Sequence, residues 1–115
     1  MTYLRRAAAI FLVYDITNTS SFDEIKDHWV EEVKRFFTPG TVIAVVGNKT
    51  DLESERVVSR DVAENYAKEL SGVFFTDVVF RECSAITGEG VQELFEEVCR
   101  MILKQSPVKN DNDKD

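Results

Sequence analysis

The segment VVGNKTDLES, residues 45–54, decides how the rest of the chain is interpreted. An apolar run stops at Gly47 and is followed at once by Asn48, Lys49 and Asp51. A short run rich in β-branched residues predicts a buried strand. The polar side chains after it would then lie at the carboxyl end of that strand, where open α/β sheets bind their ligands.

Two other segments have strand-like composition, and helical patterns separate them. Strands are predicted over residues 8–14, 41–47 and 78–83, the first two covered on both faces and the last nearer a sheet edge. The order β-α-β-α-β-α is typical of right-handed crossovers. It predicts an α/β fold of three layers, with a parallel sheet between helices.

The predicted helices run from Ser21 to Pro39, from about residue 60 to 70 and from about residue 90 to 106. Ser21 is the expected N-cap of the first helix, with Glu24 as its capping-box partner. Apolar spacing predicts burial of Phe22, Ile25, Trp29, Val33 and Phe36 in the first helix, Val62, Ala63, Tyr66 and Ala67 in the second, and Val91, Leu94, Phe95, Val98, Met101 and Ile102 in the third.

Composition excludes several classes of protein. At 115 residues the chain is at most one domain, expected over residues 1–105, with residues 106–115 as a disordered polar tail. The net charge of −7 argues against nucleic acid as the main partner. Cys83 and Cys99 have no metal-ligand spacing and are expected to be reduced core residues. With no membrane-spanning run or cleavage signature, a cytoplasmic protein without a direct membrane anchor is expected.

The side chain of Asp51 suits a guanine base. A carboxylate offers only acceptors, and guanine presents two adjacent donors, the ring N1–H and the 2-amino group. Adenine has an acceptor at N1 and would leave the carboxylate poorly paired, at a cost of about 1–3 kcal/mol. Asn48 can bond a base edge while joining loops, and the stem of Lys49 can lie along ring and sugar. On this segment alone, an ordinary polar turn after a strand is the alternative.

A second polar segment, ECSAITGEGV at residues 82–91, follows the last predicted strand. Together, Asn48-Lys49-Thr50-Asp51 and Cys83-Ser84-Ala85 resemble the guanine-specificity pair of the Ras superfamily of small GTPases. Residues 12–17 with Ser21-Phe22 are similar to the "LVYDIT...SF" signature of Rab proteins, and residues 3–7 resemble "YYRGA" more loosely. The resemblance covers residues 3–104 and only the C-terminal half of the family's P-loop domain.

The resemblance implies guanine-binding residues at Asn48, Lys49, Asp51, Ser84, Ala85 and Ile86. Asp51 would hold N1–H and the 2-amino group, the backbone N–H of Ala85 would bind O6, and Ser84 would support the loop. The family usually has Lys where this chain has Ile86, which predicts weaker base binding. Residues 71–79 form a longer connection than the family usually has, which leaves the register of the last strand open.

The family's phosphate-binding motif G-x-x-x-x-G-K-[ST] and its D-x-x-G motif do not occur in these 115 residues. We therefore predict a truncated Rab-like protein that binds the guanine of GTP or GDP, weakly, and carries neither catalytic residues nor the family's Mg²⁺ ligands. The resemblance implies a role in vesicle trafficking, peripheral to the membrane. The alternatives are a degenerate interaction module that binds no nucleotide and an unrelated small α/β protein.

The strand over residues Ala8–Tyr14 is the first in the predicted order, so it is expected to be an open apolar edge of the sheet. Such an edge predicts pairing with a missing N-terminal half or with a second copy. The isolated chain is accordingly expected to be poorly stable.

Overall fold

The computed structural model describes residues 2–3 and 9–105. Its sheet has the strand order β1-β2-β3-β4, formed by β1 (Thr2–Tyr3), β2 (Ala9–Asp15), β3 (Val42–Asn48) and β4 (Val79–Glu82). The strands β2, β3 and β4 are parallel, and β1 pairs antiparallel with β2. The predicted α/β fold with a parallel sheet is confirmed, and β4 lies at the sheet edge as expected.

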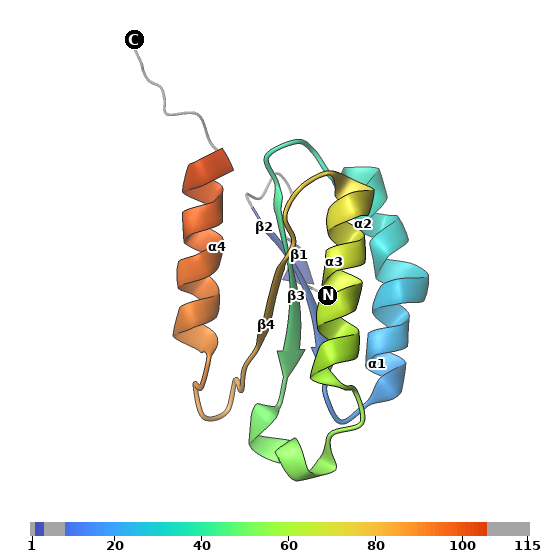
Figure 1. The fold of residues 1–115 in the computed structure, drawn as a ribbon, viewed down its shortest axis with the longest axis vertical. Coiled ribbons are helices and arrows are strands. Elements are labelled where there is room, and N and C mark those ends of the chain that lie inside the picture. Colours follow the sequence, from blue (N-terminus) through green and yellow to red (C-terminus); the bar gives the residue numbers. More distant parts are fainter. Residues whose placement is uncertain (1, 4–8, 106–115) are drawn as a thin grey trace.

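Helices cover both faces of the sheet (Figure 1). On one face lie α1 (Thr19–Glu24), the π-helical turn η1 (Ile25–Trp29), α2 (Val30–Phe36) and α3 (Arg60–Phe74). On the opposite face lies α4 (Val91–Gln105), and the short 3-10 segment η2 (Thr50–Glu55) follows β3. The three predicted layers are therefore present.

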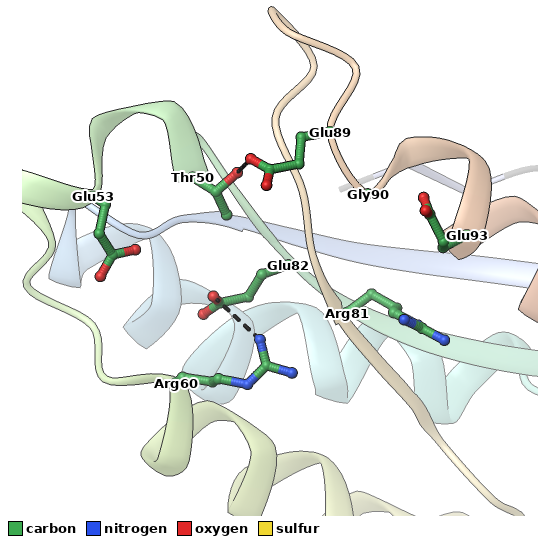
Figure 2. A pocket seen from close by; sticks show the side chains of 8 residues that line it. All are labelled: Thr50, Glu53, Arg60, Arg81, Glu82, Glu89, Gly90 and Glu93. Atoms are coloured by element: carbon green, nitrogen blue, oxygen red, sulfur yellow. Dashed lines mark hydrogen bonds and ion pairs between the residues drawn. The ribbon is translucent and has the colours of Figure 1, made fainter.

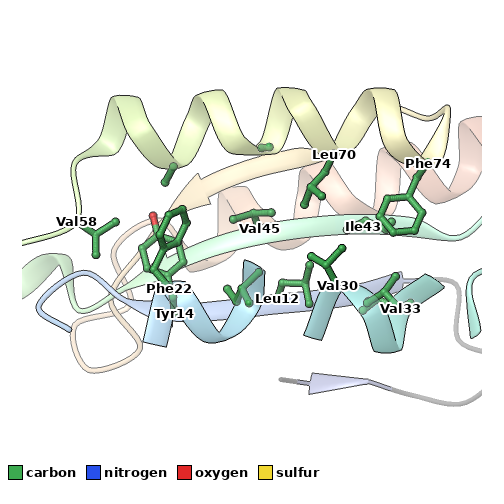
Figure 3. Packing of buried hydrophobic residues seen from close by; sticks show 14 of the residues in the cluster. Leu12, Tyr14, Phe22, Val30, Val33, Ile43, Val45, Val58, Leu70 and Phe74 are labelled. Carbon is green, nitrogen blue, oxygen red and sulfur yellow. The ribbon is translucent and has the colours of Figure 1, made fainter. Parts of the chain in front are cut away.

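Each face of the sheet has its own hydrophobic cluster. The cluster under α1 to α3 contains Ile10, Leu12, Tyr14, Phe22, Ile25, Val30, Val33, Ile43, Val45 and Leu70, among others (Figure 3). The cluster under α4 contains Val42, Ala44, Val46, Val79, Cys83, Leu94 and Val98. Because β3 contributes to both clusters, its residues from Val42 to Gly47 are all buried, as predicted for a strand covered on both faces.

The π-helical turn η1 changes which residues of the first helical segment are buried. A π turn holds more residues than an α turn, so the buried position after Ile25 is shifted by one along the chain. Val30 is 5% exposed, whereas Trp29 is only partly buried and Phe36 is 43% exposed. For this reason the predicted burial of Phe36 is wrong and that of Trp29 is only partial, although Trp29 packs against the cluster, while that of Ile25 is confirmed.

Three expected helix features differ in the structure. The N-cap of α1 is Asn18, whose side chain accepts from the backbone N–H of Ser21, so the helix begins before the predicted cap. The helix α3 continues past Gly72 because Phe74 packs into the larger cluster, and it ends at Phe74, before the C-cap residue Phe75, whose φ of 55° is left-handed. The predicted burial of Val62, which is 55% exposed, is wrong because it lies away from the sheet.

The strand β2 is not a fully open edge. Thr2 and Tyr3 pair with Phe11 and Ile10, which corrects the expectation that β2 would be the first strand of the sheet. Helix α4 covers the other face of β2 only in part, since Val13 is 37% exposed. Phe95 of α4 packs on Phe11, with ring centroids 5.5 Å apart, but is itself 50% exposed. The predictions of full coverage of this strand and of a buried Phe95 are therefore wrong.

Some expectations fall outside the described residues. These include most of the segment that resembles "YYRGA" and the predicted tail at residues 106–115. Within residues 2–3 and 9–105, no helix is long and apolar enough to cross a membrane. Cys99 is exposed, which corrects its expected burial, and Cys83 is buried as predicted.

Candidate functional site

Two loops meet at the carboxyl ends of β3 and β4. We call residues 48–58 the first loop and residues 83–90 the second loop. The N–H of Thr50 in the first loop donates to the Cys83 carbonyl of the second loop at 3.2 Å, and the N–H of Cys83 donates to the carbonyl of Gly47, at the end of β3, at 2.8 Å. The sheet register places Asn48 beside Asp15 at the end of β2. The polar segments that the sequence singled out are thus brought together.

Gly47, the residue before the first loop, lies so close to Tyr14 that there is no room for a side chain. A Cβ atom at this position would lie 2.6 Å from the Tyr14 hydroxyl oxygen and 2.8 Å from Tyr14 Cζ. Tyr14 is only 2% exposed, so its ring has no free space into which to move. The absence of a side chain at Gly47 therefore sets the position from which Asn48 leaves the strand.

Four of the predicted site residues form cross-loop hydrogen bonds. The Ser84 hydroxyl donates to Asp51 Oδ1 at 2.7 Å, and the backbone N–H of Ala85 donates to Asn48 Oδ1 at 3.0 Å. Ser84 is fully buried and also accepts from the N–H of Thr87 at 3.1 Å. Asp51 and Ala85 are exposed. A carboxylate acceptor and a backbone donor are thus held on adjoining loops at the surface.

Lys49 points to the end of β2. Its backbone is left-handed, with φ of 74°, and its ammonium lies 2.8 Å from Asp15 Oδ2. Asp15 Oδ1 also accepts from the N–H and the hydroxyl of Thr17, at 2.8 and 2.7 Å. Burial alone would raise the pKa of Asp15, but the hydrogen bonds from Lys49 and Thr17 hold it below its usual value. The hydrogen bond with Asp15 raises the pKa of Lys49.

The second loop turns sharply before α4. Gly88 and Gly90 have φ of 85° and 79°, and a Cβ at Gly90 would lie 2.6 Å from the Glu82 carbonyl oxygen. Glycine is therefore required at Gly90 both for conformation and for close approach. Ile86, at the tip of this loop, is 82% exposed. Like Asp51 and Ala85, Ile86 is exposed to solvent.

Sequence reasoning missed Arg56, which follows η2 in the first loop. Its guanidinium forms ion pairs with Glu53, at 2.8 Å, and with Glu82 of β4, at 2.7 Å. Sequence reasoning also gave Asp15 no role in the site, whereas its carboxylate forms an ion pair with Lys49. The available signal was position: Asp15 and Glu82 are acidic residues at the ends of predicted strands, where a partly buried charge requires a partner.

A hollow of about 540 Å³ lies beside these loops and is lined by Thr50, Glu53, Arg60, Arg81, Glu82, Glu89, Gly90 and Glu93 (Figure 2). None of the six predicted guanine-binding residues lines it. Arg60 Nη1 lies 3.6 Å from Glu82 Oε1, and the Thr50 hydroxyl donates to Glu89 Oε1 at 3.5 Å. This hollow is therefore distinct from the surface formed by Asp51 and Ala85.

The two loops present an acceptor at Asp51 and a backbone donor at Ala85. Within residues 2–3 and 9–105, no group of three or more His, Cys, Asp or Glu side chains is arranged to hold a metal ion. Burial raises the pKa of the Cys83 thiol, which opposes formation of a reactive thiolate. The arrangement suits a flat polar ligand that presents donors to Asp51 and an acceptor to the N–H of Ala85.

Comparisons with other proteins extend these observations. The sequence model of the Ras family matches residues 1–104. The chain is 40% identical over 108 residues to Ras-related protein RABF2b of Arabidopsis thaliana and to Ras-related protein Rab5 of Nicotiana tabacum, covering 94% of this chain and 50% of each relative. It is 39% identical over 103 residues to Ras-related protein Rab-4 of Dictyostelium discoideum, covering 90% of this chain and 47% of that protein. The chain thus spans about half the length of the relatives it matches.

Proposed function

Because the chain belongs to the Ras family, we propose that its two loops form the base-reading half of a guanine nucleotide site. One observation carries this proposal. Asp51, an acceptor, and the N–H of Ala85, a donor, lie on two loops that the 2.7 Å hydrogen bond between Ser84 and Asp51 joins. Guanine presents the complementary set on one edge: O6 as acceptor, with N1–H and the 2-amino group as adjacent donors.

Each predicted residue has a role in this site, and that of Asn48 is to join the loops by accepting from the N–H of Ala85. Asp51 accepts from N1–H and the 2-amino group, while the N–H of Ala85 donates to O6. Ser84 fixes the carboxylate of Asp51 and is itself fixed by the turn of the second loop. Lys49, held at the end of β2 by Asp15, lies with its stem along the base and ribose. Ile86 covers an apolar part of the ring without the cation that the family usually has at this position.

The geometry also supports weak binding. The N–H of Ala85 is bonded to Asn48 Oδ1 at 3.0 Å, so guanine O6 must replace or share that acceptor. Exchanging one hydrogen bond for another yields little net free energy, on the order of 1 kcal/mol or less. The bound ligand is a guanosine di- or triphosphate, whose phosphates and Mg²⁺ have no proposed ligands among this chain's residues. No residue of the chain is proposed as catalytic.

The Rab names of the relatives support a cellular role by family analogy. We place the protein in GTP-dependent vesicle trafficking, acting peripherally at vesicle membranes. Its nucleotide, its membrane and its partners are all proposals, because the chain covers about half of each relative.

Base recognition is tested by titrating the chain with fluorescent GDP and, in a parallel titration, with fluorescent ADP. We expect saturable GDP binding at high micromolar protein and no comparable ADP binding. The Asp51→Asn variant supplies the sharper test, because an amide replaces one acceptor with a donor. It should lose guanine affinity by about tenfold and gain affinity for xanthosine diphosphate, whose 2-oxo group accepts where guanine donates. Equal binding of GDP and ADP by the unmodified chain would refute the proposal.

A second candidate function is a protein-interaction module that binds no nucleotide. It is favoured by a hollow of about 380 Å³ lined by Phe37, Pro39, Gly40, Phe74, Phe75 and Thr76. Phe75 is 94% exposed there, which is unusual for a large apolar side chain. The same titration separates the two candidates, since this one predicts no guanine-selective signal.

A further inference from the structure

We propose that Arg56 is a positioning residue of the guanine site, because its guanidinium fastens the first loop to the end of β4. This inference rests on the proposed function, and it concerns how that site is kept in shape. Arg56 does not reach the base in this view of the site. Its contact with Glu82 joins the first loop to the end of β4, and its contact with Glu53 fixes the guanidinium within the first loop.

The guanidinium of Arg56 uses all of its hydrogen-bond donors. Nη1 and Nη2 donate to the two oxygens of Glu82 at 2.8 and 2.7 Å, and Nε and Nη2 donate to the two oxygens of Glu53 at 2.8 and 2.9 Å. The remaining Nη1 hydrogen donates to the Val58 carbonyl at 2.9 Å. An arginine side chain has five N–H donors in a fixed plane, so this set is saturated. Two bidentate pairs define the orientation of all three side chains.

Burial makes the contact with Glu82 more than a surface ion pair. The side chains of Arg56 and Glu82 are 18% and 6% exposed, so little water screens or replaces their interaction. A carboxylate this deeply buried requires a hydrogen-bonded cation. The hydrogen bonds with Glu82 and Glu53 raise the pKa of Arg56, which is charged at any relevant pH.

The chain places this contact next to the base-reading groups. Glu82 directly precedes Cys83, whose carbonyl accepts from Thr50, and Ser84, whose hydroxyl holds Asp51. In the first loop, Arg56 is the C-cap residue of the short η2 segment, which begins at Thr50. The cross-loop bonds of Asp51 and Asn48 end on exposed or half-exposed side chains, where water competes for them. The ion pair between Arg56 and Glu82 is the contact beside them that is largely shielded from water.

The consequence is a specific effect on base selectivity. Asp51 on the first loop and Ala85 on the second loop must contact the same base at once. If the loops separate, a base held at O6 loses the contact of its 2-amino group with Asp51. Inosine has no 2-amino group, so the ratio of affinities for GDP and inosine diphosphate measures the relative position of the two loops.

The test compares variants that separate positioning from stability. In Arg56→Met, Glu82 is left with Arg60, whose Nη1 lies 3.6 Å away. In the double variant Arg56→Met/Glu82→Met, no buried charge is left unpaired, and such replacements are often neutral for folding. Arg56→Lys keeps the charge without the planar fork. The matched control is Arg81→Met, on the same strand as Glu82; it breaks the 2.7 Å pair between Arg81 and Glu97 of α4 and leaves Glu53 and Glu82 untouched.

Two measurements on the full chain decide the matter. We expect the GDP to inosine diphosphate affinity ratio to fall about fivefold or more in the double variant, to fall less in Arg56→Lys and to stay unchanged in Arg81→Met. Hydrogen exchange at the amides of Thr50 and Ala85 should accelerate about tenfold in the double variant relative to that of Ile43 in the core. If the double variant had both the stability and the GDP to inosine diphosphate affinity ratio of the wild type, the role of Arg56 would be merely structural and the proposal would be overturned.

The exchange measurement needs no ligand, so it distinguishes the two failures. If the unmodified chain binds no guanine nucleotide, the proposed function fails, and Arg56 loses its role as a positioning residue of that site. If the chain binds GDP selectively but exchange at Thr50 and Ala85 is the same in all variants, the fastening role of Arg56 fails while the proposed function stands.

Discussion

Substitution of Gly47 by alanine is the sharpest test of how the fold positions the first loop. The new Cβ would lie 2.6 Å from the Tyr14 hydroxyl oxygen, 2.8 Å from Tyr14 Cζ and 3.2 Å from Ile16 Cγ2. Ordinary contacts between such atoms are about 3.5–4.0 Å, so either the ring or the strand must move by roughly 1 Å. Tyr14 packs edge-on against Phe22, with ring centroids 5.0 Å apart, which blocks the retreat of the ring.

The magnitude follows from two opposing effects. Overpacking a buried site costs about 1–3 kcal/mol, while replacing glycine by alanine in a strand gains about 0.5–1 kcal/mol. We therefore expect Gly47→Ala to lower the free energy of unfolding by about 1–2 kcal/mol. Tyr14→Phe should be neutral or stabilising by about 1 kcal/mol, because the buried hydroxyl has no hydrogen-bond partner among the described residues. The double variant should lose less than Gly47→Ala alone, because the nearest clashing atom is gone.

The assay is urea unfolding of the four proteins, followed by circular dichroism. Gly72→Ala is the matched control, because a Cβ at Gly72 meets no atom within 4 Å and α3 should gain helix propensity from it. The reasoning would be refuted if Gly47→Ala were as harmless as Gly72→Ala. It would also be refuted if the effects at Gly47 and Tyr14 added within about 0.5 kcal/mol.

Further predictions concern single side chains. The folded-state pKa of Asp15 lies below its ordinary value of 3.8, so its ion pair stabilises the fold above pH 3.8. This stabilisation is lost as the pH falls through the lower folded-state pKa. The urea midpoints of wild type and Asp15→Asn should therefore converge below pH 3.8, and a constant difference would contradict this. Ile86→Lys should leave stability within about 0.5 kcal/mol, since Ile86 is 82% exposed, and should tighten GDP binding about threefold by adding a long stem over the base; unchanged affinity would count against a base-covering role. Asn18→Ala should cost about 1 kcal/mol in thermal unfolding by removing the N-cap of α1, and no measurable loss would show that the cap is dispensable.

The sequence predicted those features that depend on local composition. The apolar runs that end at Asp15 and Asn48 are strands because most of their residues pack against helices, and parallel pairing with each other and with β4 then brings the polar ends together. The proximity of Asp51 and Ser84 follows from that topology alone.

Features that depend on one extra residue or on distant partners could not be predicted. Periodicity assumes 3.6 residues per turn, so the π turn at Ile25–Trp29 moved burial from Trp29 to Val30. Arg56 is one of many charged residues in the sequence, and only the fold brings it to Glu82, 26 positions away. The short β1, which pairs with Ile10 and Phe11, lacks the length that identifies strands by pattern.

The contacts that position the candidate site differ in kind from those that would bind its ligand. Gly47 and Gly90 act by the absence of side chains, and Arg56 acts from a partly buried network, so all three resist competition from water. Asp51 and Ala85, which would contact the base, are exposed and already partly paired within the protein. Binding energy from these two contacts is therefore limited, whereas discrimination between bases is not, because a wrong edge leaves Asp51 facing an acceptor. A base-reading half-site of this construction should be more selective than it is tight.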